Sequence, residues 1–311
     1  MKNNSLTLSQ AINGYFLFAR ARRLSEHTLD DYQNTFNRFR KFMGDETLIN
    51  KITVQDVQRF LAEQNDVSKK TVLNYHTGLS ALWSWAIQEK FVNKHVVRAT
   101  PRPKPEKKEI IPFTEAEIKA LLASLKQSRS YTRPGKIKSQ HNLPSEMLNR
   151  AMILLLLDTG VRASELASLR SYQVDRRNQR IQVMGKGARE RTVPFSARTA
   201  QALWRYLTTR NELSGGDPLF LKSKSERPMT RDALGKILAS IGRRTGIPNV
   251  YPHRFRHTFA IQFLRNGGDP YTLQRMLGHS TLETVKIYLQ LAQIDLDIAH
   301  RRASPVDNWN L

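Results

Sequence analysis

The sequence contains no cysteine, which excludes disulfide-stabilised scaffolds, thiolate metal sites and cysteine nucleophiles. It also lacks a long apolar run: the longest, "ILLLL" at 153–157, is far shorter than the ~20 residues that span a bilayer. The N-terminus, "MKNNSLTLSQ", has no apolar segment of the kind found in signal peptides. These absences predict a cytoplasmic protein, and contents of 40% hydrophobic and 8% aromatic residues are typical of a soluble globular chain.

Acidic residues are scarce, with 27 Asp and Glu against 50 Lys and Arg, which gives a formal net charge of +23. Such an excess causes self-repulsion unless a polyanion neutralises it, and a phosphate backbone is the usual partner. An anionic membrane is the alternative, but the sequence has no Lys-rich amphipathic anchor. The carboxylates form no cluster suited to two Mg²⁺ ions, so the composition favours a nucleic-acid-binding protein over a two-metal nuclease.

A length of 311 residues suits about two domains. Residues 1–100 carry apolar side chains at helical spacing, as in "TLSQAINGYFLFARA", which predicts a helical domain. Further helices are expected from Ser25, a plausible N-cap, after Thr53, and from Ser68. The stretch "TPRPKPEKKEIIP" then alternates proline with charge, so residues 101–111 are predicted to form an extended linker between domains.

Residues 112–311 are predicted to form the second, larger domain. "TEAE" (114–117) is a capping box that begins a helix, and "SEMLNRAMILLLLDTG" predicts a buried helix that ends at Gly160. "IQVMGKGARERTVPF" (181–195) alternates like two strands joined by a turn, which predicts a β-hairpin. The fold class is therefore mainly α with a small antiparallel β-sheet. The basic stretch 126–144 is predicted to be a surface loop, either a DNA contact or a solvated insertion.

Several polar groups are candidates for chemistry, although each has an ordinary explanation. Arg162 and Glu165 in "TGVRASEL" are three residues apart, so they face the same side of a helix, where a surface ion pair is common. Lys186 in "GKG" would normally be a solvated turn residue. His253 and Arg256 in "HRFRHTF" are also three residues apart and point the same way, an arrangement that is more often structural than catalytic.

A metal site is the rival interpretation of the histidine-rich stretch. His253 and His257 are four residues apart, a spacing that suits zinc, but Arg254 and Arg256 surround them with positive charge that disfavours a cation. The "GKG" stretch lacks the upstream glycine and the following Ser or Thr of a phosphate-binding P-loop. ATP hydrolysis and metal-dependent nuclease chemistry are therefore disfavoured.

Attack on a phosphodiester without a metal requires a defined set of groups. Arginine forks neutralise the phosphoryl oxygens, a tyrosine nucleophile keeps the phosphate bond energy, a lysine protonates the leaving 5′-oxygen, and histidines help manage the tyrosine proton. In "GHSTLETVKIYLQL", Ser280 and Glu283 predict a capping box, so a helix begins just after His279. This turn brings His279 and Tyr288 toward one phosphate, and Tyr288 is predicted to be the nucleophile.

Four motifs in this order resemble those of the tyrosine recombinase (phage integrase) family, and the resemblance covers nearly the whole chain. "TGVRASEL" resembles the first arginine box, "GKGARERTVP" the lysine hairpin, and "HRFRHTFA" the His-x-x-Arg box, with Phe255 where leucine is usual. "LGHSTLETVKIY" resembles the box that contains the second histidine and the nucleophile. The resemblance implies a catalytic set, with Glu165 in a supporting role: Arg162, Lys186, His253, Arg256, His279 and Tyr288.

The same resemblance implies an architecture and a set of partners. An N-terminal helical, SAM-like core-binding domain (1–100) and a mixed α/β catalytic domain (112–311) would close around double-stranded DNA as a C-shaped clamp. The reaction would pass through a 3′-phosphotyrosyl intermediate in a homo-tetramer, with neither a metal nor a nucleotide cofactor. The C-terminal segment "LAQIDLDIAHRRASPVDNW" would dock on a neighbouring subunit or pack on its own chain. No additional arm-binding domain is expected, because the helices begin almost at Met1.

The expected function is site-specific DNA recombination, by a mobile-element or phage integrase or by an Xer-like resolver. One alternative is a catalytically silent DNA-binding regulator on the same fold. Another is a type IB topoisomerase, which shares the chemistry but requires no specific site. A covalent complex on a nicked suicide substrate would distinguish an enzyme from a regulator.

Overall fold

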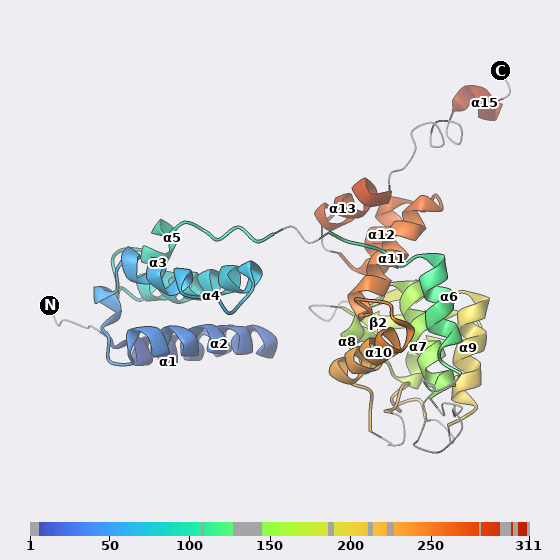
Figure 1. Cartoon of the computed structure of the whole chain (residues 1–311), viewed down its shortest axis with the longest axis horizontal. Coiled ribbons are helices and arrows are strands. Elements are labelled where there is room, and N and C mark those ends of the chain that lie inside the picture. The colour runs from blue at the N-terminus through green and yellow to red at the C-terminus, as the bar shows by residue number, and fades with distance from the viewer. Residues whose placement is uncertain are drawn as a thin grey trace, which may run out of the picture. The chain divides into compact units, whose positions relative to one another are not determined.

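The computed structural model describes the following residues: 6–106, 109–126, 145–185, 190–210, 214–222, 227–279, 281–292, 300 and 304–309. The chain divides into two compact units, Met1–Glu109 and Ile110–Leu311 (Figure 1). Within the described residues, none of the helices is both long and apolar enough to cross a membrane.

The N-terminal unit is built from helices that begin at polar caps. The side chains of Thr7, Ser25, Thr53 and Ser68 each accept a hydrogen bond from the backbone N–H three residues further on. A cap of this kind satisfies one of the backbone donors that the first helical turn leaves without a partner. The N-cap predicted at Ser25 is confirmed, as are the helix starts predicted after Thr53 and from Ser68. The elements are α1 (Leu8–Ala21), α2 (Glu26–Met43), η1 (Ile49–Lys51), α3 (Val54–Ala62), α4 (Lys69–Gln88) and α5 (Val96–Ala99).

Aromatic residues fill the core of this unit. Phe36, Phe39, Phe60 and Trp83 are fully buried. Phe39 and Phe60 pack edge to face with ring centroids 5.0 Å apart, and Tyr15 meets Phe36 in the same way at 5.6 Å. Such contacts are favourable because the positive edge of one ring faces the negative face of the other. They join helices α1 to α4 into one helical domain.

The C-terminal unit is also mainly helical. Thr114 and Glu117 form the predicted capping box before its first helix. Residues 127–144, which include most of the predicted basic loop, lie outside the described residues. The helices are α6 (Glu115–Ala123), α7 (Glu146–Thr159), α8 (Ala163–Ser168), η2 (Ser171–Gln173), α9 (Ala197–Leu207), α10 (Arg231–Thr245), α11 (Pro252–Arg265), α12 (Pro270–Leu277), α13 (Glu283–Ala292) and α15 (Pro305–Trp309).

A small antiparallel sheet lies beside these helices, with strands in the order β1 (Val174–Asp175), β2 (Arg180–Met184) and β3 (Glu190–Pro194). Ile181 pairs with Val193, and both side chains are buried. The β-hairpin and the mainly α fold class with a small antiparallel sheet are therefore confirmed. Strand β1 was not predicted because two residues give no periodic pattern. The hairpin tip, 186–189, which includes Lys186, lies outside the described residues.

Helix α7 ends at Gly160, as predicted. Gly160 has a φ of 60°, in the left-handed region that favours glycine. A Cβ atom at this position would lie 2.4 Å from Cδ1 of Phe259, so only glycine allows the end of α7 to approach α11 this closely. The close approach places the carbonyl oxygen of Gly160 against Arg256 of α11.

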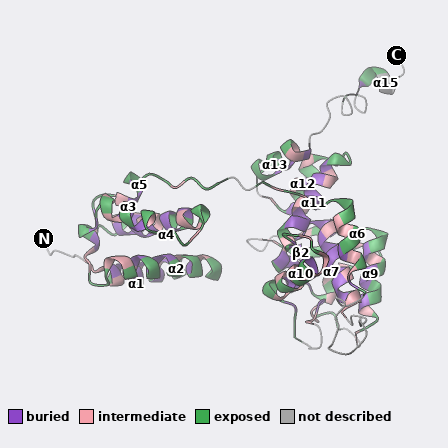
Figure 2. Ribbon diagram, in the orientation of Figure 1, coloured by how far each residue is buried: buried purple, intermediate pink, exposed green. Residues whose placement is uncertain are grey.

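Two hydrophobic clusters make up the interior of this unit. The larger one surrounds α7 and includes the inward side chains of β2 and β3, whereas the smaller one is formed by α11, α12 and α13. Buried residues are concentrated along α7 and α11 (Figure 2). The candidate site lies where these two clusters meet.

Candidate active site

Arg256 is the buried centre of the site, with 3% of its surface exposed. Its Nη1 donates to the carbonyl oxygen of Gly160 (2.6 Å), and its Nη2 donates to that of Leu277 (2.7 Å). Helix α11 thereby holds the ends of α7 and α12 together. Burial and the nearby charge of Arg162 lower the pKa of Arg256 to about 10, so the guanidinium stays charged at neutral pH.

His279 follows α12 and is oriented by the same guanidinium. Nη2 of Arg256 lies 2.8 Å from Nε2 of His279. Because a guanidinium can only donate, this nitrogen must accept, and the imidazole hydrogen belongs on Nδ1. Nδ1 is buried and has no hydrogen-bond partner among the described residues. The site therefore contains a buried N–H group that has no acceptor among the described residues.

Arg162 precedes α8 as its N-cap residue. Its backbone N–H donates to Oε2 of Glu165 (2.7 Å) and its Nη1 donates to Oε1 (2.8 Å). The predicted pairing of Arg162 with Glu165 is present, but the ordinary explanation of a surface ion pair is wrong, because Glu165 is only 5% exposed. Nη2 of Arg162 also reaches the carbonyl oxygen of Gly278 at 3.3 Å. About a third of the Arg162 side chain stays accessible (32%), so this cation can contact a ligand.

Arg191 on β3 is a third arginine of the site, and the motifs did not indicate it. Its Nη1 and Nη2 donate to the two carboxylate oxygens of Glu165, both at 2.8 Å, and its Nε donates to the carbonyl oxygen of Met276 (2.8 Å). Burial raises the pKa of Glu165, but the hydrogen bonds from Arg191 and from Arg162 outweigh it and lower the pKa to about 2. One signal was available: Arg191 shares a strand face with Val193, so a charged side chain points inward.

Tyr288 projects from α13 into the same region and is only 3% exposed. Its hydroxyl lies 2.9 Å from Nδ1 of His257, and its ring stacks on that of His279 at 6.4 Å with an interplanar angle of 17°. The hydroxyl thus has a polar partner in His257, although the ring is packed in an apolar cluster. Burial raises the pKa of Tyr288, while the charges of Arg256 and Arg162 act in the opposite direction.

Two further histidines stand on α11. His253 is exposed in the first turn, and its ring centroid lies 6.3 Å from that of His257. Burial, followed by neighbouring charges, lowers the pKa of His253, and lowers those of His257 and His279 to about 4. At neutral pH the three imidazoles are therefore uncharged.

The site as a whole is electropositive. Three guanidiniums (Arg162, Arg191 and Arg256) face one carboxylate, Glu165, which leaves two positive charges in excess. Within the part of the chain that the structure describes, no three His, Asp or Glu side chains are grouped as a metal site. An electropositive cluster of this kind is suited to an anion such as a phosphodiester.

The structure places five of the six predicted catalytic residues around this region. Lys186 lies outside the described residues, as does Ser280, the predicted cap of the last motif's helix. His257, which the sequence suggested only as a zinc ligand, lies directly on the Tyr288 hydroxyl. The other described positions are Arg162 before α8, His253 and Arg256 on α11, His279 after α12, and Tyr288 on α13.

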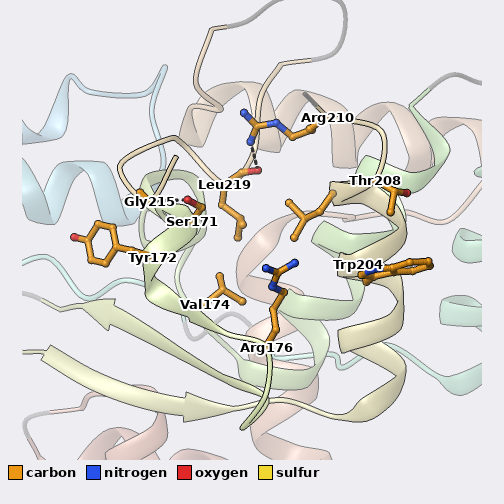
Figure 3. A pocket seen from close by; sticks show the side chains of 10 residues that line it. Ser171, Tyr172, Val174, Arg176, Trp204, Thr208, Arg210, Gly215 and Leu219 are labelled. Atoms are coloured by element: carbon orange, nitrogen blue, oxygen red, sulfur yellow. Dashed lines mark hydrogen bonds between the residues drawn. The ribbon is translucent and has the colours of Figure 1, made fainter. Parts of the chain in front are cut away.

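A separate hollow of about 520 Å³ lies between η2, β1 and α9 (Figure 3). Tyr172, Arg176 and Trp204 line it, and Arg210 donates to the carbonyl oxygen of Leu219 at its rim (2.8 Å). None of its lining residues belongs to the site around Tyr288.

The sequence matches two family models. Residues 113–294 match the phage integrase family, and residues 12–90 match the phage integrase N-terminal SAM-like domain. Among curated relatives, the tyrosine recombinase XerC of Listeria innocua is 27% identical over 293 residues, which cover 91% of this chain and 93% of the relative. XerC of Staphylococcus aureus USA300 is 29% identical over 294 residues, covering 91% and 92% of the two chains.

Solved structures with a similar fold include a transposon integrase, lambda integrase and the XerH site-specific recombinase. The Tn1549 transposon integrase in complex with a circular intermediate DNA has a TM-score of 0.73 at 21% identity and covers 91% of this chain and 95% of its own. A lambda integrase dimer bound to a COC′ core site has a TM-score of 0.73 at 16% identity, with coverages of 94% and 80%. XerH bound to a palindromic difH substrate has a TM-score of 0.68 at 20% identity, with coverages of 96% and 85%. At these identities the likeness concerns the fold.

Proposed function

Because the chain belongs to the phage integrase family, we propose that it is a tyrosine-type site-specific recombinase that cleaves and rejoins DNA. The observation that carries this proposal is the position of the Tyr288 hydroxyl, which lies beside an electropositive cluster contributed by α8, α11 and the segment after α12. We assign DNA core binding to residues 1–100, the linker to 101–111 and catalysis to 112–311.

In the proposed reaction the scissile phosphate binds at the electropositive cluster. Arg162 and Arg256 neutralise the non-bridging oxygens, and the Nδ1–H of His279 donates to one of them. Glu165 orients Arg162 by accepting its hydrogen bond, and Arg191 in turn holds Glu165. His253, at the exposed end of the site, also contacts the phosphate.

Tyr288 then attacks the phosphorus. The bond from its phenolic oxygen to phosphorus forms as the bond to the 5′-oxygen breaks, and Lys186 gives that oxygen a proton. The product is a 3′-phosphotyrosyl enzyme and a free 5′-hydroxyl. Because the new ester keeps the bond energy of the old one, attack by another 5′-hydroxyl rejoins the DNA, and the proposed cycle uses neither a metal nor a nucleotide cofactor.

The DNA partner and the assembly follow from charge and family. The net charge of +23 supports binding to duplex DNA, and the relatives' structures named above contain DNA. We propose a homo-tetramer on the recombination site, in which the C-terminal segment of each subunit docks on a neighbour. The exposed Val306 and Trp309 of α15, three residues apart and 56% and 71% exposed, support this exchange.

The biological role is proposed at the level of class. The XerC relatives are 27% and 29% identical over nine-tenths of both chains, against 21% for the Tn1549 transposon integrase, which favours an Xer-like resolver over a mobile-element integrase. A cytoplasmic location is proposed with it, because the proposed substrate is duplex DNA.

The test is a covalent trap. The protein is incubated with a library of duplexes that are nicked just beyond a randomised position, and protein–DNA adducts are recovered from denaturing gels. Wild type should form adducts whose sequenced junctions fall at one phosphate of a common site, whereas Tyr288→Phe should form none. Specific DNA binding without adducts from wild type would instead support the catalytically silent regulator.

A further inference from the structure

We propose that His257 is an additional catalytic residue, the base that accepts the proton of the Tyr288 hydroxyl. This inference rests on the proposed recombinase function. Nδ1 of His257 lies 2.9 Å from the phenolic oxygen, which is the atom that would attack phosphorus. Among the described residues, no other side chain lies within hydrogen-bond distance of that oxygen.

The other two histidines are less suited to this task. His279 uses Nε2 to accept from Arg256, so its remaining nitrogen is a donor, and its ring stacks on Tyr288. His253 is exposed at the start of α11 and does not contact the hydroxyl. His257 stands one turn further along the same helix, where α11 packs against α13. We therefore assign phosphate contact to His253 and His279, and proton acceptance to His257.

The state of the His257 ring fits a base. Burial, with His253 and Arg256 nearby, lowers the pKa of His257 to about 4, so the ring is neutral and Nδ1 can keep a lone pair for the phenol. Helix α11 fixes the position of His257, because the preceding residue, Arg256, is hydrogen-bonded to the carbonyl oxygens of Gly160 and Leu277. The hydroxyl is therefore held on a fixed acceptor before DNA arrives.

The proton balance of the step is complete. The O–H bond of Tyr288 breaks and its proton moves to Nδ1 of His257, while the tyrosine oxygen bonds to phosphorus. The bond to the 5′-oxygen breaks, and Lys186 protonates that oxygen. The new imidazolium faces His253 and Arg256, and the bound phosphate supplies the negative charge that stabilises it. In rejoining, His257 returns the proton to Tyr288.

The test compares His257→Asn and His257→Ala with wild type in single-turnover cleavage of a nicked site. Asparagine keeps a hydrogen-bonding group near the position of Nδ1 but cannot take a proton. We expect both variants to bind DNA within about twofold of wild type and to cleave more slowly, on the order of 10²–10⁴-fold. Millimolar imidazole should restore cleavage at least about tenfold in His257→Ala, and should leave wild type unchanged.

A substrate with a 5′-bridging sulfur distinguishes the base from the acid. The sulfur leaves without a proton, so it should rescue Lys186→Ala, the matched control, but not His257→Asn. Cleavage by His257→Asn within about twofold of wild type, or rescue of that variant by sulfur, would overturn the proposal. Absence of a covalent adduct from wild type would instead overturn the recombinase function itself. Thermal unfolding of each variant verifies that it folds.

Discussion

Arg191 and Glu165 form a bidentate ion pair in which both carboxylate oxygens accept from one guanidinium at 2.8 Å. The pair joins β3 to α8, and the third nitrogen of Arg191 joins both to the end of α12. This buried ion pair therefore links the lysine hairpin to the first arginine box and to the second histidine box. Displacement of the hairpin would disturb Arg162 and His279 together.

Loss of the Arg191–Glu165 ion pair should destabilise the protein. In Arg191→Met the Glu165 carboxylate stays buried with one guanidinium fewer, and the free energy of unfolding should fall by about 3 kcal/mol. The measurement is urea unfolding followed by circular dichroism. Arg205→Met, an exposed position on α9, is the matched control and should stay within about 0.5 kcal/mol of wild type. Equal stabilities of the two variants would contradict the role assigned to Arg191.

Stability should fall as the solution becomes mildly acidic. The pKa values of His257 and His279 lie at about 4 in the folded protein, whereas an unperturbed histidine has a pKa of 6.5. Between these values the unfolded chain binds more protons, so stability is fully present above pH 6.5 and is lost as the pH falls toward 4. The charged groups around the two rings are Arg162, Arg191, Arg256 and Glu165, and the titratable His253 faces His257.

Urea midpoints measured between pH 7.5 and 4.5 test this dependence. His257→Asn lacks one of the titrating rings and should show a weaker decline over the same range. A decline as steep as that of wild type would show that other groups cause the acid sensitivity. Glu165 titrates lower, because its pKa is about 2, and it should contribute only below pH 4.5.

Arginine replacements in the site should impair chemistry far more than DNA binding. Arg256→Lys keeps a charge, but an ammonium group cannot reproduce the fork that reaches Gly160, Leu277 and His279. We expect cleavage to slow by roughly 10²–10³-fold. The dissociation constant for DNA should change only a few fold, because many other cations provide affinity. Parallel losses in gel-shift and cleavage assays would contradict the assignment.

The C-terminal residues should matter for assembly rather than for bond cleavage. Trp309→Ala removes an exposed indole from α15 and should weaken tetramer formation on a full site, measured by analytical ultracentrifugation. Cleavage of an isolated half-site should stay within about twofold, because Trp309 is not part of the proposed chemistry. Gln182→Ala, an exposed position on β2, serves as the surface control. Unchanged assembly would argue for a tail that packs on its own chain.

The sequence predicted elements more readily than it predicted contacts. Helix starts at Ser25 and Thr53 followed from capping residues, and the hairpin followed from alternation, because both depend on neighbours in the chain. The convergence of Arg162 and Tyr288 came from the order of motifs, since spacing alone does not determine which helices meet.

The two residues that sequence analysis missed show where local patterns stop. Arg191 acts through Glu165 and Met276, which lie 26 and 85 residues away in the sequence. His257 was considered with His253, its neighbour one turn away, whereas its functional contact is Tyr288, 31 residues further on. Arg162 also differed: the spacing predicted a place on a helix face, but it caps the helix instead.

The junction at Gly160 has a consequence for the whole catalytic unit. A methyl group there would clash with the Phe259 ring on α11, the helix of Arg256, and with a δ-carbon of Leu277, the last residue of α12, which His279 follows. The minimum distance between the end of α7 and α11 is thus determined by the contact of the Gly160 backbone with the Phe259 ring. The distances between the catalytic groups depend on that contact. A side chain added at Gly160, although remote from the reacting phosphorus, would increase them.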